Sequence, residues 1–439
     1  MSSKKRLFWV GAILLVLVAA TVAVLLWPQT PTPTPGVDKT VQLHNFTEAE
    51  VTSVTVTRPD ATLSFYKVQD GQWNIEGRDP AEVDAAYVFE TVNGAAVLTA
   101  IEKLADSVDN PADYGFLTPA ATVSVHGAEG TLSTLVFGNK TLDQSAYYTQ
   151  LAGKPEVYLV ATLVVKPFLY TPTQYLKKDI FDTSLAEVSA IAVKHPNHGE
   201  FRIVRTADPK DEMTLGSWAM TAPYPKETRP QETEDWIQSI LSITGEDLIE
   251  NTLNAPEYGL LTPDVTVTVT TKLGRTEKIL MSTEKSALYK VGRDRIYLLP
   301  ATAKEFLNTA PFSLLEPFLT KVDITTLSSF AWDGHTISLG DRYVLNGKEI
   351  SSDAFKKAYL ELMMVTIMAP AQEADSVALA KPPVFEYTFT AQNGTKTQVS
   401  LYEINPQTYL AKINGRTDYR VDAYKVQTAK NALNALLEE

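Results

Sequence analysis

Histidine is the residue type in this chain best suited to proton transfer or metal binding, and only two of its five copies lie close together. The two form the sequence His195-Pro-Asn-His198, and the others are His44, His126 and His335. A metal site needs ligands that converge on one point, and the proline breaks helical spacing between the pair. A Pro-Asn turn between strands expected at 188–193 and 201–204 explains the pair, so we predict no metal site.

Nucleophilic and cofactor chemistry have no motif in this sequence. The chain has no cysteine, which excludes thiol catalysis and disulfides. No Gly-x-Ser-x-Gly elbow occurs, because Gly216-Ser217-Trp218 lacks the second glycine. A Walker phosphate loop and a Gly-x-Gly-x-x-Gly motif are also absent from the sequence. We therefore predict no catalytic and no cofactor-binding residues, and we expect that the protein is not an enzyme.

A seven-residue phrase occurs twice, as Asp113-Tyr-Gly-Phe-Leu-Thr-Pro119 and as Glu257-Tyr-Gly-Leu-Leu-Thr-Pro263. The copies lie 144 residues apart, which indicates a duplicated domain. The tyrosines could line twin ligand pockets. We favour a structural role, in which the glycines adopt positive φ, the prolines end the turn, and the Tyr and Leu side chains fill the core. The residues of this predicted structural motif are Tyr114, Gly115, Pro119, Tyr258, Gly259 and Pro263.

A hairpin pattern follows each copy of the phrase. Residues 146–160 and 287–299 alternate aromatic and aliphatic side chains around a glycine turn, as expected for a β-hairpin. Residues 407–421 show the same pattern around Asn414-Gly415, although no Tyr-Gly phrase precedes them. The sequence thus predicts two clear repeats and one divergent repeat.

The N-terminus predicts membrane attachment. Lys4, Lys5 and Arg6 precede an uncharged apolar run at 7–27, and 21 residues suffice to cross a bilayer core of roughly 30 Å. The basic residues place the N-terminus in the cytoplasm and the bulk of the chain outside it. A cleaved signal peptide is the alternative, but Leu25-Leu26-Trp27 is a poor cleavage sequence, so we expect an uncleaved anchor. Spaced prolines in 28–40 indicate a stiff spacer.

Composition narrows the partners. The chain carries 39 basic and 52 acidic side chains, for a net charge of −13. This balance argues against nucleic acid, whose phosphates require basic surfaces. The roughly 400 residues after the spacer exceed one typical domain.

We predict an α+β fold: an N-terminal transmembrane helix, then two clear repeats and one divergent repeat of antiparallel sheet with a packed helix. Helices are expected at 83–104, 234–241, 353–368 and 426–437. Val265-Thr-Val-Thr-Val-Thr270 should be a strand with valines toward the core and threonines toward solvent or a neighbouring sheet. The predicted divisions are a cytoplasmic tail at 1–6, a transmembrane helix at 7–27, a spacer at 28–40, and repeat domains at 41–175, 183–312 and 322–439.

The basic start, the apolar run, the Pro/Thr spacer and the repeated Tyr-Gly phrase together resemble a bacterial family of domain-of-unknown-function proteins. The resemblance covers residues 1 to about 310. It implies a membrane-anchored extracytoplasmic protein, often encoded beside ABC transporters similar to the gliding-motility type. It implies no catalytic residues.

Three functions follow as hypotheses. We first expect a non-enzymatic, single-pass extracytoplasmic accessory or scaffold protein of an ABC-type transport complex, with a permease and an ATPase as partners. The alternative is a binding module for an envelope glycan or a small solute. A surface hydrolase with unrecognised carboxylates is the third.

Overall fold

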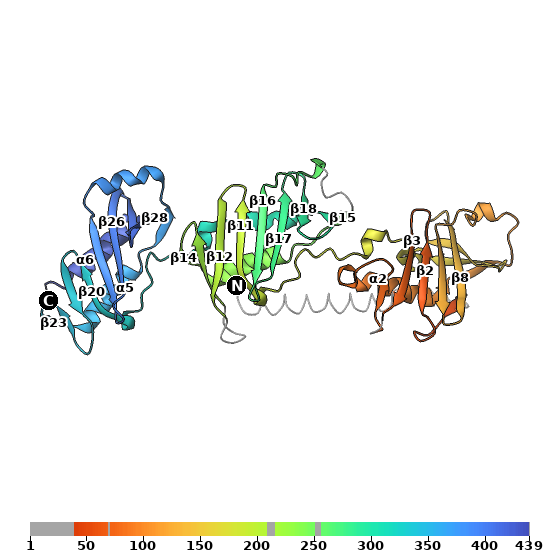
Figure 1. Cartoon of the computed structure of the whole chain (residues 1–439), viewed down its shortest axis with the longest axis horizontal. Coiled ribbons are helices and arrows are strands. Elements are labelled where there is room, and N and C mark those ends of the chain that lie inside the picture. The colour runs from red at the N-terminus through yellow and green to blue at the C-terminus, as the bar shows by residue number, and fades with distance from the viewer. Residues whose placement is uncertain (1–38, 69–70, 209–215, 251–255, 439) are drawn as a thin grey trace, which may run out of the picture. The chain divides into compact units, whose positions relative to one another are not determined.

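The computed structural model describes residues 39–68, 71–208, 216–250 and 256–438 (Figure 1). The chain divides into two compact units, with the boundary between Lys177 and Lys178.

The first unit contains an eight-stranded antiparallel sheet of strand order β4-β3-β2-β7-β8-β9-β10-β6 and a two-stranded sheet, β1-β5. Its strands are β1 (Val41–Asn45), β2 (Ser53–Thr57), β3 (Thr62–Lys67), β4 (Trp73–Ile75), β5 (Val97–Ala100), β6 (Glu102–Ala105), β7 (Ala121–Gly127), β8 (Gly130–Lys140), β9 (Ala146–Leu151) and β10 (Val157–Ala161). Its helices are α2 (Ala85–Ala96) and α3 (Thr162–Val165), with 3-10 turns η1 (Pro80–Glu82), η2 (Pro111–Tyr114), η3 (Lys166–Leu169) and η4 (Pro172–Tyr175).

The second unit contains two nine-stranded antiparallel sheets. One has the order β14-β13-β12-β11-β16-β17-β18-β19-β15, with β11 (Val188–His195), β12 (Gly199–Ala207), β13 (Ser217–Ala222), β14 (Lys226–Glu227), β15 (Asp247–Glu250), β16 (Val265–Thr271), β17 (Thr276–Ser282), β18 (Ala287–Lys290) and β19 (Arg295–Leu298). The helix of this repeat is α4 (Pro230–Leu241), and its 3-10 helices are η5 (Leu185–Glu187), η6 (Pro256–Tyr258), η7 (Ala301–Asn308) and η8 (Pro311–Leu314).

The last sheet has the order β23-β22-β21-β20-β25-β26-β27-β28-β24. Its strands are β20 (Leu327–Trp332), β21 (His335–Ser338), β22 (Tyr343–Leu345), β23 (Lys348–Ile350), β24 (Ile367–Pro370), β25 (Phe385–Ala391), β26 (Lys396–Asn405), β27 (Thr408–Ile413) and β28 (Arg416–Asp422). It carries α5 (Ser352–Met363) and α6 (Ala423–Ala435), with η9 (Ile324–Thr326) and η10 (Glu373–Ala380).

The three large sheets share one topology, so the chain contains three structural repeats. In each sheet the first strand in sequence lies in the middle, paired on one side with the second strand (β3, β12, β21) and on the other with a later strand (β7, β16, β25). Each repeat also has one helix of 12 residues between its edge hairpin and its last edge strand, namely α2, α4 and α5. The predicted repetition is therefore confirmed, and the third repeat keeps the topology although it lacks the Tyr-Gly phrase.

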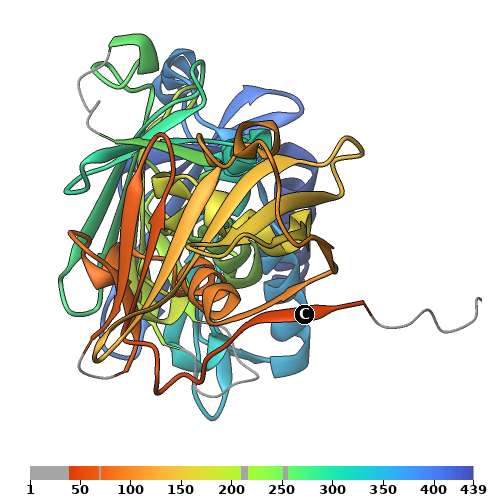
Figure 2. The same cartoon turned by 90° about the vertical axis from the view of Figure 1, so that its right-hand side faces the viewer.

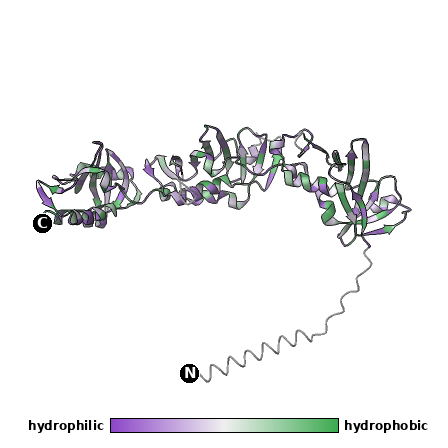
Figure 3. Ribbon diagram, turned by 90° about the horizontal axis from the view of Figure 1, so that it is seen from below, coloured by the Kyte–Doolittle hydropathy of each residue, from purple (hydrophilic) through white to green (hydrophobic). Residues whose placement is uncertain are grey.

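Alternating side chains explain why these segments form half-buried strands. On β16 the valines at 265, 267 and 269 are fully buried, whereas the threonines between them are partly exposed. This agrees with the predicted alternation, since successive residues of a strand face opposite sides of the sheet. Hydrophilic and hydrophobic residues accordingly both occur along the strands of every sheet (Figure 3).

The helices differ from the predicted ones in their limits: α2 and α5 are shorter than predicted, whereas α4 is longer. In the first unit α2 packs against one face of the large sheet (Figure 2) and ends at Ala96 instead of continuing to residue 104. Residues 97–100 alternate between exposed and buried and form β5, because apolar residues at this spacing satisfy a strand as well as a helix. The helix α4 begins at Pro230, four residues before the predicted start, and α5 ends at Met363, five residues before the predicted end.

The predicted fold class, α+β with an N-terminal transmembrane helix, is wrong for the part of the chain that the structure describes. There, antiparallel strands dominate in four sheets, and the longest α-helix, α6, has 13 residues. Among these residues no helix is both long enough and apolar enough to cross a bilayer. The apolar run at 7–27 lies outside the described residues.

Candidate functional site

An apolar groove lies in the first unit between the segment that follows β1, the start of β4, α2 and the start of β5. Its volume is about 540 Å³, and the rings of Phe46, Trp73 and Phe89 contribute to its lining. Phe89 is 64% exposed and Val97 46% exposed, although both are large apolar residues. Glu48, Gln72 and Asn93 add polar groups. An exposed apolar surface interrupted by polar groups is typical of a contact site for a protein or a ligand.

Helix α2 positions this groove because it is apolar on two sides. Asp84 caps its N-terminus by accepting a hydrogen bond of 2.9 Å from the backbone N–H of Ala86. Val88, Thr91 and Ala95 face the core and are fully buried. Ala85, Phe89 and Ala96 line the groove at spacings of four and seven residues, which places them on one side of a helix.

The repeated phrase forms the same turn in the first two repeats. Gly115 has φ of +82° and Gly259 has φ of +68°, a region that favours glycine. A Cβ atom on Gly115 would lie 2.5 Å from the backbone nitrogen of Asn139, and one on Gly259 would lie 2.6 Å from Ser282 Oγ. Both glycines therefore permit a close approach of the turn to the neighbouring strand, β8 or β17.

The phrase contacts the hairpin that follows it. Tyr114 packs edge-on against Tyr148 of β9, with ring centroids 4.9 Å apart. In the second repeat, Tyr258 and Tyr289 pack against a small cluster that includes Leu260. The predicted core role of the leucines is only partly right, because Leu117 is 72% exposed and Leu261 64% exposed. Pro119 and Pro263, which follow them, are half-buried just before β7 and β16.

In the third repeat, η10 precedes β25 as η2 and η6 precede β7 and β16. Its Asp375 accepts hydrogen bonds of 2.7 Å from two nitrogens of Arg420 on β28. Sequence reasoning missed this element because Ser376-Val377 replaces Tyr-Gly. One signal in the sequence could have identified this element: an acidic residue is followed by a proline, as in the repeated phrase. The spacing from Asp375 to Pro382 is one residue longer than that from Asp113 to Pro119.

The two histidines lie at the turn between β11 and β12. His195 ends β11, is buried, and its Nε2 lies 2.9 Å from the backbone oxygen of Leu307. Its Nδ1 accepts a hydrogen bond of 3.0 Å from the backbone N–H of Asn197. Burial lowers the pKa of His195. The hydrogen bond to the backbone of Leu307 acts in the opposite direction, but its effect is smaller. Within the residues that the structure describes, no group of three or more His, Asp or Glu side chains is placed to hold a metal ion.

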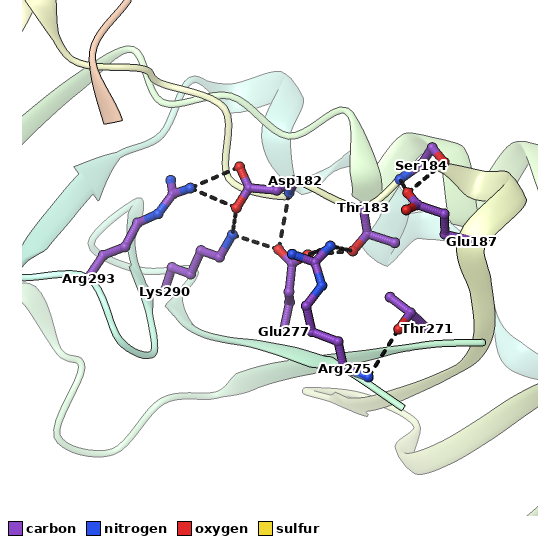
Figure 4. Close-up of polar contacts among 9 residues, drawn as sticks. All are labelled: Asp182, Thr183, Ser184, Glu187, Thr271, Arg275, Glu277, Lys290 and Arg293. Carbon is purple, nitrogen blue, oxygen red and sulfur yellow. Dashed lines mark hydrogen bonds and ion pairs between the residues drawn. The ribbon is translucent and has the colours of Figure 1, made fainter. Parts of the chain in front are cut away.

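A network of charged side chains ties the segment before β11 to the sheet of the middle repeat (Figure 4). At its centre Glu277 and Lys290 form an ion pair of 2.6 Å, with 5% and 7% of their side chains exposed. Glu277 also accepts hydrogen bonds from the hydroxyl of Thr183 and from the backbone N–H of Asp182, the latter at 3.1 Å. Arg275 lies 3.1 Å from the carboxylate as well.

Asp182 extends the network toward solvent. Its half-exposed carboxylate lies 2.8 Å from Lys290 Nζ and 2.9 Å from the guanidinium of Arg293. Arg293 also donates to the hydroxyl of Tyr297 at 2.7 Å and to the backbone oxygen of Asp179 at 2.9 Å. The segment 179–183 is therefore fastened to β17, to β19 and to the end of β18.

The buried ion pair is specific to the middle repeat. Strand register shows this, because Glu277 pairs with Val269 on β16 just as Ser133 pairs with Val125 on β7. Lys290 likewise pairs with Ile279 as Leu151 pairs with Leu135. In the third repeat the equivalent positions are Thr397 and Ile413. The shared fold therefore does not require charges at these two positions.

The two carboxylates of the network, Glu277 and Asp182, are held in their ionised form. Burial would raise the pKa of Glu277, but its hydrogen bonds and the charge of Lys290 outweigh burial and lower the pKa. At Asp182, burial would likewise raise the pKa of the carboxyl group. The hydrogen bonds and charges of Lys290 and Arg293 outweigh burial, so the pKa of Asp182 is also lowered. Both carboxylates stay ionised at neutral pH and only accept hydrogen bonds. Their role is to position the segment 179–183.

Three sheets of one strand order, each with its helix, define a protein built from tandem repeats. A family model described as a domain of unknown function (DUF4340) matches the chain over residues 73–217 and again over 218–382. The chain belongs to this family, which confirms the predicted membership of a family of unknown function. A comparison with curated protein sequences found no match.

Proposed function

We propose that the protein is a non-enzymatic accessory or scaffold protein of a bacterial ABC-type transport complex, attached to the membrane through residues 7–27 and extracytoplasmic beyond them. The apolar groove of the first unit is the observation that carries this proposal. It exposes Phe89 and Val97 in the unit that follows the apolar run in sequence. An apolar segment of a membrane partner would bury these side chains.

The proposal commits to a permease as the occupant of the groove, with an ATPase recovered through the permease. Membrane attachment supports this choice because it confines the first unit near integral membrane proteins and raises their effective concentration. The resemblance to proteins encoded beside ABC transporters supports it independently of the groove.

Cross-linking in native membranes followed by affinity purification of the full-length protein tests the proposal. We expect the permease and the ATPase to be recovered with the wild-type protein and to be lost with Phe89→Ser. Leu142→Ser is the matched control, because Leu142 is fully exposed in a turn of the same unit and outside the groove. Recovery of the protein alone, or equal recovery with Phe89→Ser, would sink the proposal.

The alternative function is a binding module for a glycan or a small solute. A different observation favours it: Lys194, Arg202 and Lys278 border a hollow on the sheet of the middle repeat. A surface hydrolase has weaker support. Its catalytic acid would need a raised pKa, whereas the pKa of the buried Glu277 is lowered.

A further inference from the structure

A hollow of about 420 Å³ lies on the open face of the middle sheet, on the side opposite the core. Four residues paired in register across β12, β11, β16 and β17 form its main row, in the order Arg202, Ala192, Thr268 and Lys278. The small side chains of Ala192 and Thr268 form the floor. Arg202 and Lys278 stand at the two ends, three strand spacings or roughly 14 Å apart.

A third cation borders the same hollow. Lys194 lies two residues along β11 from Ala192, on the same face of the sheet, and pairs in register with Thr266. Glu200, which pairs with Lys194, is the one carboxylate among the lining residues. The hollow therefore has an excess of two positive charges in a chain whose net charge is −13.

The side chains of Lys194, Arg202 and Lys278 are all exposed. In contrast to the cations of Figure 4, none of these three side chains has an ion-pair or hydrogen-bond partner among the described residues. Their charges are therefore available to a ligand.

The other repeats lack this arrangement. At the register positions of Arg202, Ala192, Thr268 and Lys278, the first repeat has Ser64, Thr55, Ser124 and Thr134. Ser124 and Thr134 there hydrogen bond to each other at 3.0 Å. The third repeat has Thr336, Ala331, Thr388 and Gln398. The sheet therefore forms without these cations, and folding does not account for their presence.

We propose that this hollow binds a small phosphate-bearing solute. A guanidinium group presents paired N–H donors that match two phosphate oxygens, and two ammonium groups suit a ligand with more than one negative charge. The hydroxyls of Thr266 and Thr268 can bond the polar body of the ligand. Because the face is open to solvent, the affinity should fall as salt increases. The proposal does not depend on the partner assigned to the groove of the first unit.

Isothermal titration calorimetry of the detergent-solubilised full-length protein with inorganic pyrophosphate, at fixed ionic strength, tests the proposal. Arg202→Ser combined with Lys278→Thr installs the residues of the first repeat and should preserve the sheet. We expect the affinity to fall about a hundredfold, since each of the two lost charged hydrogen bonds weakens binding roughly tenfold. The matched control is Lys154→Thr with Lys381→Thr, which removes two exposed and unpaired lysines elsewhere and should leave the affinity unchanged.

Three outcomes would overturn the proposal. The first is the absence of any binding heat with the wild-type protein. The second is an equal loss of affinity in the two double variants, which would show general charge attraction. The third is citrate binding as tightly as pyrophosphate, which would assign the hollow to carboxylates instead of phosphates.

Discussion

Glu277 and Lys290 are charged residues at positions where the same fold elsewhere uses Ser133 and Leu151 or Thr397 and Ile413. Burying two charges costs desolvation energy, and their mutual attraction offsets it only when both are present. The pair should therefore contribute little net stability, while the loss of one partner should be costly.

Lys290→Leu should lower the free energy of unfolding by about 3 kcal/mol, because it leaves a buried carboxylate with only Arg275 as a cationic partner. Glu277→Ser combined with Lys290→Leu copies the first repeat and should lie within about 1 kcal/mol of the wild-type protein. Urea denaturation of the three proteins measures both values. Equal destabilisation by the single and the double change would contradict this account.

The two carboxylates of the network, Glu277 and Asp182, should make the stability of the protein depend on pH in the acidic range. The folded-state pKa values of Glu277 and Asp182 are lowered, so their contribution is complete above the ordinary carboxyl values of about 4 and is lost as pH falls toward the lowered values. The urea midpoint of the wild-type protein should therefore drop more steeply below about pH 4.5 than that of the Glu277→Ser, Lys290→Leu variant. Parallel curves for the two proteins would show that these carboxylates do not contribute.

At the scale of elements, the turn formed by the phrase depends on a backbone contact. Gly115→Ala would place a Cβ atom 2.5 Å from the nitrogen of Asn139 at a φ of +82°. Gly153→Ala is the matched control, because Gly153 has φ of +77° and open space around it. The control should cost about 1 kcal/mol for the backbone alone, and Gly115→Ala about 1–3 kcal/mol more for the overlap. Similar thermal midpoints for the two variants would mean that the turn can move away from β8.

Local patterns in the sequence predicted some of these elements and not others. The alternation at 265–270 identified β16, because a half-buried strand needs only its own residues to show its two faces. The region 97–105 misled the prediction, since its apolar spacing suits both a helix and the strands β5 and β6. The corresponding turn of the third repeat was not predicted. The helix η10 occupies its position in the fold, but η10 does not contain the Tyr-Gly sequence.

The candidate sites were beyond prediction for a different reason. Arg202, Lys194 and Lys278 lie on three strands and come together through strand register. Asp182 and Lys290 are distant in sequence and meet through a side-chain contact. No local pattern marks a charge whose partner lies on another strand. The groove likewise depends on where Phe46 and Trp73 lie relative to α2.

At the scale of the whole molecule, our proposal attaches the protein to the membrane through residues 7–27, which fall within residues 1–38, outside the described part. Deleting them should move the protein from the membrane pellet to the supernatant after cell fractionation, because the 21-residue apolar run is removed. A wash with concentrated salt should not release the full-length protein, since apolar burial is not screened by ions. Full-length protein in the supernatant would contradict the assignment.

The two family matches begin at Trp73 on β4 and at Trp218 on β13, the third strand of one repeat and the third strand of the next. A gene fragment cut at those limits would encode β4 without β2 and β3, and would end with β11 and β12 but no β16 to pair with β11. Such a polypeptide would leave β4, β7 and β11 each without a partner strand, and would be prone to aggregate. Recombinant expression of a single unit should instead respect the boundary between Lys177 and Lys178.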